Sequence, residues 1–387
     1  MNTEEILSRG VAEIIDEQHL RASLKSKHKL RIKHGIDPTS QHIHIGRAVV
    51  LWKLRAFQEL GHKIVLIVGD FTGLIGDTSD KDSERPMLSE KIVRENMKTY
   101  ERQIFKILDR LKTEVHYNSK WLRKLGFIEI GRMADLFGWH EFSSRENVKR
   151  RIVEGRRVSL REVLYPLMQG YDSVAVKADL ELGGTDQKFN LLAGRTIQKH
   201  YGQAPQDIMT MALLEGLDGR KMSSSWGNVV NITDEPSEMF GKIMSLRDEL
   251  IQKYFLLCTQ LSPVETEMIQ KGSSSPRSLK ARLAREIVSL YHGSRAAAAA
   301  EKNFESKFGK TKGDIVPDYT LNKKPGTYEI VPILVEGKLA KSNSEARRKI
   351  AEGAVEVGGT KITDAQAKVK LAKGVLIRLG KRFLKII

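Results

Sequence analysis

A polar segment at residues 34–47 carries side chains that are suited to bind a nucleotide phosphate. It contains the hydroxyl of Thr39, the imidazole of His44 and the guanidinium of Arg47, at a point where an apolar strand is expected to turn into a helix. The N-terminus of a helix attracts anions because its backbone N–H groups are unpaired and its dipole is positive there. Gly46 leaves room for a ligand to approach the backbone. The segment predicts a phosphate site, although an ordinary polar turn would explain it equally well.

A second group of polar residues follows helical spacing. Tyr165, Gln169 and Asp172 recur at offsets of four and three, which places three polar groups on one face of a mostly apolar helix. Such a seam indicates a binding site. The plainer explanation is a helix face that is simply exposed to water.

Two turns complete the candidate chemistry. Residues 180–182 are expected to form a short strand that is followed by two glycines, which admit a ligand, and Asp186 is placed to accept ribose hydroxyls. Residues 218–225 are expected to form a mobile polar loop that carries the cation Lys221. Alone, this loop is also consistent with an ordinary surface turn.

The elements that must position these residues indicate an α/β fold. Residues 46–60 have helical spacing, and the unbroken apolar run at 64–68 predicts a strand buried on both faces of a parallel sheet. A strand, a helix and a strand with a ligand turn after the first strand are typical of a Rossmann-type domain, whose ligands bind at the carboxyl ends of the strands. Residues 69–77 should therefore lie on the same rim as the first turn.

Outside this core the sequence predicts mainly helices. Residues 3–20 have a weak helical pattern, and Ser89 can cap a long helix that runs to Leu111. Residues 115–164 are rich in Arg and Lys, as expected of an insertion or a dimer-forming subdomain. Residues 279–305 are helical by pattern.

The C-terminal part of the chain is basic. Residues 310–326 contain two prolines and several Lys, Gly and Asp residues, which predicts a linker. Residues 327–387 hold 13 Lys+Arg against 6 Asp+Glu and are expected to form two helices, a hairpin and final strands. Arg347, Arg348 and Lys349 place positive charge on the second helix, which favours RNA binding. A solvated helix face is the alternative.

Composition sets the class of protein and the compartment. A chain of 387 residues with 40% hydrophobic and 29% charged residues is typical of a soluble protein of two or three domains. The net charge of +17 favours a polyanionic partner such as nucleic acid. A single cysteine, Cys258, excludes an intramolecular disulfide and a multi-thiolate zinc site. We expect a cytoplasmic protein without a membrane segment, because no signal core and no apolar run of about 18 residues occurs.

Several motifs together resemble one enzyme family. The residues 44–47 resemble the His-x-Gly-His signature of class I aminoacyl-tRNA synthetases, and residues 221–225, about 175 residues later, resemble their Lys-Met-Ser-Lys-Ser loop. The similarity extends to bacterial tyrosyl-tRNA synthetases through Gly35-Ile36-Asp37-Pro38-Thr39, residues 69–77, Tyr165-x-x-x-Gln169-x-x-Asp172 and residues 182–187. Residues 327–387 resemble the RNA-binding module of ribosomal-protein type that this family carries.

The resemblance implies an architecture and an activity. We expect a Rossmann-type catalytic domain at 1–216 with a dimer-forming insertion at about 115–165, a mobile loop and helical tRNA-contacting domain at 217–309, a linker at 310–326 and a small α+β RNA-binding domain at 327–387. The family activates L-tyrosine with ATP and Mg²⁺ to tyrosyl-adenylate and pyrophosphate, and then transfers the tyrosyl group to tRNA(Tyr). No structural metal is implied, and a homodimer is expected.

The resemblance also assigns roles to individual residues. Catalytic roles fall to Thr39, His44, Arg47, Lys81, Arg85 and Lys221. ATP contacts are implied for Gly35, Asp37, His44, Gly46, Arg47, Gly184, Asp186, Lys221, Met222, Ser223, Ser224 and Ser225. Tyrosine contacts are implied for Lys33, Asp77, Tyr165, Gln169, Asp172 and Gln187, with Asp172 at the phenolic hydroxyl. RNA contacts are implied for Arg347, Arg348 and Lys349.

The chain departs from the family pattern at three positions. Lys33 stands where well-known members place a tyrosine against the phenol of the substrate, so the phenol pocket is expected to be built differently. Ser224 replaces the second lysine of the mobile loop, and Arg47 replaces the second histidine of the first signature. An arginine in the first turn of a helix is disfavoured by about 0.5 kcal/mol unless it faces an anion. We hypothesise that Arg47 supplies the charge that Ser224 omits; the alternative is that Arg47 points to solvent.

Two other functions compete with this interpretation. Tryptophanyl-tRNA synthetases share the catalytic fold and the serine-rich loop, although the basic C-terminal module and the Gly-Gly-Thr-Asp-Gln turn argue against them. An RNA-binding or RNA-modifying protein with a degenerate nucleotide domain would bind tRNA without exchanging pyrophosphate into ATP. An exchange assay with tyrosine and with tryptophan distinguishes all three.

Overall fold

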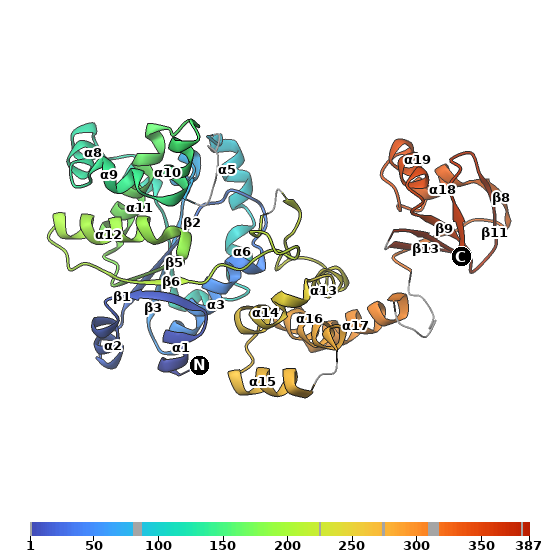
Figure 1. Cartoon of the computed structure of the whole chain (residues 1–387), viewed down its shortest axis with the longest axis horizontal. Helices are drawn as coiled ribbons and strands as arrows, with labels where there is room; N and C mark the ends of the chain where they lie inside the picture. The colour runs from blue at the N-terminus through green and yellow to red at the C-terminus, as the bar shows by residue number, and fades with distance from the viewer. Residues whose placement is uncertain (1, 80–86, 224–225, 273–274, 309–316, 381) are drawn as a thin grey trace. The chain divides into compact units, whose positions relative to one another are not determined.

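The chain forms two compact units in the computed structural model, Met1–Ala297 and Ala298–Ile387. The structure describes residues 2–79, 87–223, 226–272, 275–308, 317–380 and 382–387 (Figure 1). The division falls inside the helix α17 (Ser294–Phe308), and the helices expected as a separate domain at 217–309 mostly belong to the first unit.

A six-stranded sheet forms the centre of the first unit, in the order β1-β6-β5-β2-β3-β4. Five strands are parallel: β2 (Arg31–Ile36), β3 (Lys63–Val68), β4 (Thr113–Tyr117), β5 (Leu180–Gly184) and β6 (Asp207–Met211). The chain moves outward from β2 through β3 and β4, and then returns to the other side of β2 to form β5 and β6. This arrangement confirms the expected Rossmann-type sheet and creates a switch point between β2 and β5.

The N-terminal segment differs from the single helix expected at 3–20. It contains α1 (Thr3–Ser8), the strand β1 (Val11–Ile15) and α2 (Glu17–Lys25). Gly10 takes a left-handed φ of +67°, which ends the first helical segment. The strand then pairs antiparallel with β6 and so satisfies its backbone groups at the edge of the sheet.

Long helices pack against the sheet of the first unit. The helix α3 (Ile45–Glu59) packs against β3 and β5, and α11 (Leu160–Val176) packs against β2 and against α12 (Lys188–His200). The apolar side chains on α3 and on β3 are buried because both elements pack inside the core. Gly61, with φ of +94°, follows the end of α3 as expected.

The region between β3 and α11 is built from short helices. Ser89 caps α5 (Glu90–Met97) by accepting from the backbone N–H of Ile92, but the expected long helix ends there. Also, residues 115–117 belong to β4 and not to the expected insertion. The remaining short elements are α4 (Thr72–Ile75), α6 (Tyr100–Ile104), the 3-10 turn Arg110–Lys112, α7 (Ser119–Leu122), α8 (Phe127–Ala134), α9 (Trp139–Ser143) and α10 (Glu146–Val153).

Helices follow the sheet in the first unit. They are α13 (Pro236–Met244), α14 (Ile251–Cys258), α15 (Pro263–Gly272) and α16 (Pro276–His292), with a 3-10 turn at Asp248–Leu250. Another 3-10 turn, Thr185–Gln187, joins β5 to α12. Gly293, with φ of +86°, separates α16 from α17, so the predicted helix at 279–305 is two helices.

Hydrogen bonds join these helices to the rest of the first unit. Trp52 of α3 donates to the hydroxyl of Tyr291 at 3.1 Å. Arg9 donates to the carbonyls of Leu256 and Leu261 at 2.8 and 2.6 Å, which ties these helices to the N-terminal segment.

The second unit is a small α+β domain with its own core. Its helices are α18 (Ile330–Glu336) and α19 (Asn343–Ala351), and its strands are β7 (Tyr319–Leu321), β8 (Gly326–Glu329), β9 (Val355–Val357), β10 (Thr360–Ile362), β11 (Lys368–Leu371), β12 (Leu376–Leu379) and β13 (Arg382–Ile386). The five-stranded sheet has the order β10-β9-β12-β13-β7. Because β7 pairs with β13, the expected linker at 310–326 contains part of the domain itself.

Candidate active site

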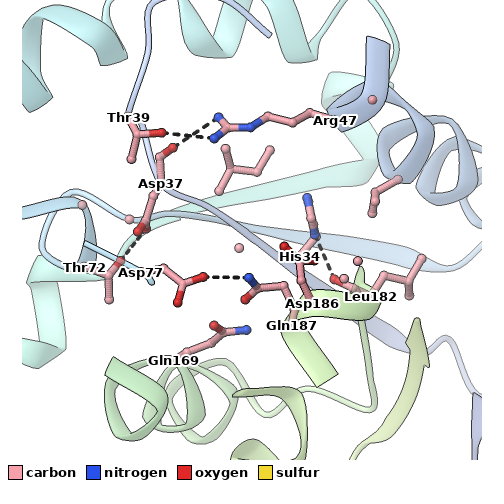
Figure 2. Close-up of a pocket in the computed structure, with 18 of the residues that line it drawn as sticks. His34, Asp37, Thr39, Arg47, Thr72, Asp77, Gln169, Leu182, Asp186 and Gln187 are labelled. Atoms are coloured by element: carbon pink, nitrogen blue, oxygen red, sulfur yellow. Dashed lines mark hydrogen bonds between the residues drawn. The ribbon is translucent and has the colours of Figure 1, made fainter. Parts of the chain in front are cut away.

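A cavity of about 640 Å³ lies at the carboxyl ends of β2 and β5, at the switch point of the sheet (Figure 2). Sixteen of the predicted site residues line it: Gly35, Asp37, Thr39, His44, Gly46, Arg47, Asp77, Tyr165, Gln169, Asp172, Gly184, Asp186, Gln187, Lys221, Met222 and Ser223. They come from the first turn, the segment 69–77 that follows β3, the polar seam of α11, the glycine turn and the polar loop. Segments far apart in the sequence therefore meet in one site.

Lys33 is the predicted contact residue that the structure does not bring to this cavity. Its side chain is fully buried in the sheet, and its Nζ lies 2.9 Å from Oε1 of Glu181 on the neighbouring strand. The expected contact between Lys33 and tyrosine is therefore replaced by an ion pair behind the cavity wall. Four other predicted residues lie outside the part of the chain that the structure describes: Lys81, Arg85, Ser224 and Ser225.

Asp172 is a buried acidic residue that lines the cavity. Its Oδ1 accepts from the indole N–H of Trp121 at 2.7 Å, and its Oδ2 accepts from Nδ2 of Asn118 at 3.2 Å. Burial raises the pKa of Asp172 to about 7, against the opposing effects of the Lys33 charge and these two hydrogen bonds. The carboxylate is held in place and can accept one more hydrogen bond from a ligand.

Asp77 and Gln187 form a hydrogen-bonded pair that also lines the cavity. Asp77 Oδ2 accepts from Gln187 Nε2 at 2.7 Å, and its Oδ1 accepts from the backbone N and the Oγ of Ser79 at 2.9 and 2.6 Å (Figure 2). Arg145 in turn donates to Ser79 Oγ at 2.7 Å, and burial lowers the pKa of this guanidinium. The carboxylate of Asp77 is thus oriented by its neighbours toward the cavity.

Asp37 joins the first turn to the polar seam of α11. Its Oδ1 accepts from Thr72 Oγ1 at 2.7 Å, and its Oδ2 accepts from the hydroxyl of Tyr165 at 2.8 Å. Burial and the charges of Asp37 and Asp77 raise the pKa of Tyr165 well above its usual range. A Cβ at Gly69 would lie 1.9 Å from Asp37 Oδ1, so a glycine is needed there.

His44 is placed at the start of α3, as the resemblance implied. Its Nδ1 accepts from the backbone N–H of Arg47 at 3.3 Å and so caps the helix. Burial and the charge of Arg47 lower the pKa of His44 to about 3, so the imidazole is neutral and its proton lies on Nε2. A Cβ at Gly46 would lie 3.0 Å from Sδ of Met222, which shows how closely the polar loop approaches this turn.

Arg47 folds back over the first turn and does not point to solvent. Its guanidinium donates to Oγ1 of Thr39 at 3.1 Å and to the hydroxyl of Tyr100 at 2.7 Å (Figure 2). A Cβ at Gly35, on the strand below, would meet no atom within 4 Å. The cavity therefore offers a cation and open backbone at the same end.

Lys221 reaches this end of the cavity from the polar loop. Its Nζ lies 3.6 Å from Oδ2 of Asp186, the residue expected at the ribose. Asn228 holds the loop, because its Nδ2 donates to the carbonyl of Lys221 at 3.0 Å and its Oδ1 accepts from the N–H of Ser223 at 2.8 Å. The lysine is thus positioned between the turn that follows β5 and the start of α3.

Sequence reasoning missed several residues that hold this site together. Asn118 and Trp121 fix Asp172, Thr72 fixes Asp37, and His34 donates through Nδ1 to the carbonyl of Leu182 at 2.9 Å across the sheet. Asn118 directly follows β4, and residues that follow parallel strands meet at the ligand rim. That signal was present in the sequence, but it was hidden because residues 115–164 were expected to be an insertion.

Family models match almost the entire chain. A model described as tRNA synthetases class I (W and Y) matches residues 25–309, and one described as Tyrosine--tRNA ligase SYY-like C-terminal domain matches residues 309–384. The matches define a class I tRNA synthetase with a C-terminal domain.

Solved structures support the fold. A C-terminally truncated mitochondrial tyrosyl-tRNA synthetase from Aspergillus nidulans aligns with a TM-score of 0.65 at 21% identity, over 79% of this chain and 93% of that one. Tyrosyl-tRNA synthetase complexed with L-tyrosine from Archaeoglobus fulgidus aligns with a TM-score of 0.62 at 21% identity, over 77% and 98% of the two chains.

Curated relatives narrow the class to one family. Tyrosine--tRNA ligase from Moorella thermoacetica is 47% identical over 387 residues, which cover 97% of this chain and 93% of the relative. The enzyme of the same name from Carboxydothermus hydrogenoformans is 48% identical over 399 residues, which cover 99% and 97%. The chain belongs to the tyrosine--tRNA ligase family.

Proposed function

We propose that this protein activates L-tyrosine with ATP and then esterifies the tyrosyl group to the 3′ end of tRNA(Tyr). The observation that carries the proposal is the polarity of the cavity. Two oriented carboxylates, Asp77 and Asp172, line the cavity together with two cations, Arg47 at the first turn and Lys221 opposite Asp186. Tyrosine needs acceptors for its ammonium and its phenol, and ATP phosphates need donors and cations.

At the nucleotide end, catalysis consists of positioning and electrostatic stabilisation. The tyrosine carboxylate attacks the α-phosphorus of ATP, the bond to the leaving pyrophosphate breaks, and no covalent enzyme intermediate is needed. Neutral His44 donates through Nε2–H, and the cations Arg47 and Lys221 stabilise charge on the phosphates. ATP brings Mg²⁺ with it as part of the substrate. Among the described residues, no group of three metal-ligating side chains could hold an ion.

At the amino-acid end, Asp172 provides selectivity for tyrosine. Its carboxylate accepts the phenolic O–H, while Asp77, Tyr165 and Gln169 surround the ammonium. Phenylalanine would bury Asp172 without that hydrogen bond, and a buried acceptor left unpaired is costly. Asp172 can accept from an indole N–H, as it does from Trp121, so tryptophan is disfavoured by the larger size of its ring.

The decisive experiment is amino-acid-dependent exchange of labelled pyrophosphate into ATP. We expect exchange with tyrosine and no measurable exchange with tryptophan or phenylalanine at equal concentration. Exchange with tryptophan and not with tyrosine would show that tryptophan is the substrate. Failure with every amino acid, in a preparation that still binds tRNA, would support the RNA-binding alternative.

We also infer a homodimer that forms through the helices after β4. This region exposes large apolar side chains, with Phe127 90% and Leu160 80% accessible, together with Ile128, Trp139 and Val153. Contiguous exposed apolar surface is typical of protein interfaces. Light scattering should give twice the chain mass, and Phe127→Glu with Leu160→Glu should give the monomer. Leu111→Glu is the matched control, because Leu111 is also 90% exposed but lies outside this region.

The C-terminal unit is proposed to bind tRNA in the cytoplasm. Arg347 and Arg348 are exposed on α19, and Lys349 lies beside them although it also pairs with Glu352 at 2.6 Å. No helix in the described part of the chain is long and apolar enough to span a bilayer. Cell fractionation against a periplasmic and a cytoplasmic marker tests the compartment.

A further inference from the structure

The buried ion pair between Lys33 and Glu181 lies directly behind the amino-acid end of the cavity. The two residues face each other on β2 and β5, and both side chains are essentially inaccessible to water. Lys33 uses all three of its donors, to Glu181 Oε1, to the carbonyl of Gln169 at 2.8 Å and to Ser173 Oγ at 2.8 Å. A buried ion pair is weak evidence for stability, because desolvation offsets the attraction. Its position at the cavity wall suggests another role.

Glu181 fixes the orientation of one side chain that lines the cavity. Its Oε1 accepts from Gln169 Nε2 at 3.1 Å, and its Oε2 accepts from Ser173 Oγ at 3.1 Å and from Gln206 Nε2. A carboxylate only accepts, so the amide of Gln169 can bind it through the nitrogen and not through the oxygen. A rotated amide would set two acceptor oxygens against each other. Gln169 therefore directs its Oε1 away from Glu181 and toward the cavity.

The direction of that oxygen matches the neighbouring groups. Gln169 lines the same cavity as the bonded pair of Asp77 and Gln187, and in the view of Figure 2 its amide is drawn below that pair. Asp77 and Gln169 Oε1 are both acceptors there, which suits a ligand cation. The reversed amide would present two N–H donors to the same cation and repel it.

We propose that Glu181, with Lys33 as its counter-ion, is a positioning residue that holds the Gln169 amide with its oxygen toward the α-ammonium of the amino-acid substrate. The proposal rests on the proposed function, since it takes tyrosine as the ligand. It also explains why a lysine is accepted at position 33: the lysine neutralises Glu181, and it touches the helix that carries Gln169 and not the substrate.

The test compares tyrosine with 3-(4-hydroxyphenyl)propanoate, which lacks only the amino group. In Lys33→Met/Glu181→Met, both charges are removed together, so neither is left unpaired. We expect the tyrosine KM in pyrophosphate exchange to rise about tenfold, with kcat and the inhibition constant of the propanoate each within about twofold. A parallel loss of both ligands would show a merely structural role and overturn the proposal. So would no change in either.

Two further variants sharpen the result. Lys33→Met/Glu181→Gln keeps an acceptor oxygen for Gln169 and should restore most of the tyrosine affinity. Ser173→Ala removes a hydrogen bond from both charged residues but leaves the contact from Gln169 to Glu181, so it should leave the tyrosine KM within about twofold. If the rescue variant is as impaired as the Met double variant, orientation of the amide is not the cause.

A measurement on the unaltered protein covers the case in which the Met variant does not fold. In a crystal structure of the wild-type protein with tyrosine, Gln169 Oε1 should lie within hydrogen-bond distance of the ammonium while Nε2 still contacts Glu181. An ammonium beyond that distance would overturn the proposal. A wild-type protein without tyrosine-dependent exchange would instead refute the proposed function, so the two failures are distinguishable.

Discussion

At the amino-acid end of the cavity, Asp172 is held by neutral hydrogen-bond donors, whereas at the nucleotide end Lys221 is held by Asp186, a group that we expect to bind ATP. Arg47 likewise bonds the hydroxyl of Thr39, another expected phosphate ligand. The phenol site at Asp172 is therefore ready for its ligand before the ligand arrives, although Asp77 and Gln187 at the same end bond each other. The nucleotide end must exchange contacts within the protein for contacts with ATP.

This difference predicts which kinetic parameter, KM or kcat, each substitution should change. Changes at the preformed end remove contacts that exist in the ground state, so they should act mainly on the tyrosine KM and on selectivity. Changes at the exchanging end remove contacts that form fully only as charge develops on the phosphates, so they should act mainly on kcat. Each prediction below can break or sharpen this contrast.

The largest effect is expected for Lys221→Ala. We expect kcat for adenylate formation to fall by about 10²–10³, with the tyrosine KM nearly unchanged, because one cation that stabilises the charge of the transition state is lost. Rapid-quench measurement of adenylate formation tests this. Arg220→Ala is the matched control, since Arg220 pairs with Asp218 beside the cavity. A rise in KM with kcat intact would place Lys221 in ground-state binding.

Asp172→Asn should act on selectivity. An asparagine retains an oxygen for Trp121 but sets its Nδ2 against that of Asn118, and it accepts the phenol only as a neutral group. We expect the ratio of kcat/KM for tyrosine over phenylalanine to fall about 10- to 100-fold, as for loss of a hydrogen bond to a charged group. Asp70→Asn is the control, because Asp70 contacts Ser119 outside the cavity. An unchanged ratio would show that the phenol lies elsewhere.

Truncation of the C-terminal unit separates amino-acid activation from tRNA binding. Ending the chain at Phe308 should leave exchange within about twofold, while tRNA affinity falls about tenfold or more and depends less on salt, because phosphate contacts are lost. Filter binding at several salt concentrations measures both. A truncation after residue 326 is less suitable for this test, since it keeps β7 but removes its partner β13. Unchanged tRNA affinity would remove this unit from recognition.

The raised pKa of Asp172, about 7, predicts a pH dependence of tyrosine binding. Protonation removes the carboxylate as pH falls, so the tyrosine KM should rise about fivefold from pH 7 to pH 6 for one titrating group. Stability should change in the opposite sense. Because the folded pKa lies above the ordinary 3.8, Asp172 alone lowers the free energy of unfolding as pH rises from about 4 to 7. Equilibrium dialysis of tyrosine between pH 6 and pH 7 measures the expected loss of binding. The Asp172→Asn variant is the control, because its binding of tyrosine should not change over this range.

The smallest effect is expected for Arg47 and Ser224, the two residues at the nucleotide end that depart from the family pattern. Adenylate formation should be measured for Arg47→His, Ser224→Lys and the double variant. If Arg47 supplies the charge that Ser224 omits, the double-mutant cycle should show a coupling of about 0.5–1 kcal/mol, or a two- to fivefold departure from additivity. Simple addition of the two effects would reject compensation.

The sequence was a good guide where one element carries its own signal. The apolar run that became β3 indicated a parallel sheet, and the two glycines that end β5 indicated a ligand rim. The edge strands β1 and β7 were not foreseen, because each is short and is defined by a partner distant in the sequence. A pairing of that kind leaves no local pattern.

The residues of the site could likewise be predicted where the signal is local, and not where it depends on a distant strand. The spacing of Tyr165, Gln169 and Asp172 identified the polar face of α11, but the purpose of Lys33 could not be seen from its own strand. Only the register with β5 reveals that a glutamate stands opposite. Resemblance gave the list of site residues; the packing of the strands changed the role of one of them.

The neutral imidazole of His44 has a consequence for how the enzyme would respond to its surroundings. With a pKa lowered to about 3, His44 keeps the same charge throughout the range in which Asp172 titrates. Acidification should therefore resemble a shortage of tyrosine and not a shortage of ATP. We expect added tyrosine to restore the rate in a mildly acidified reaction, whereas added ATP should not.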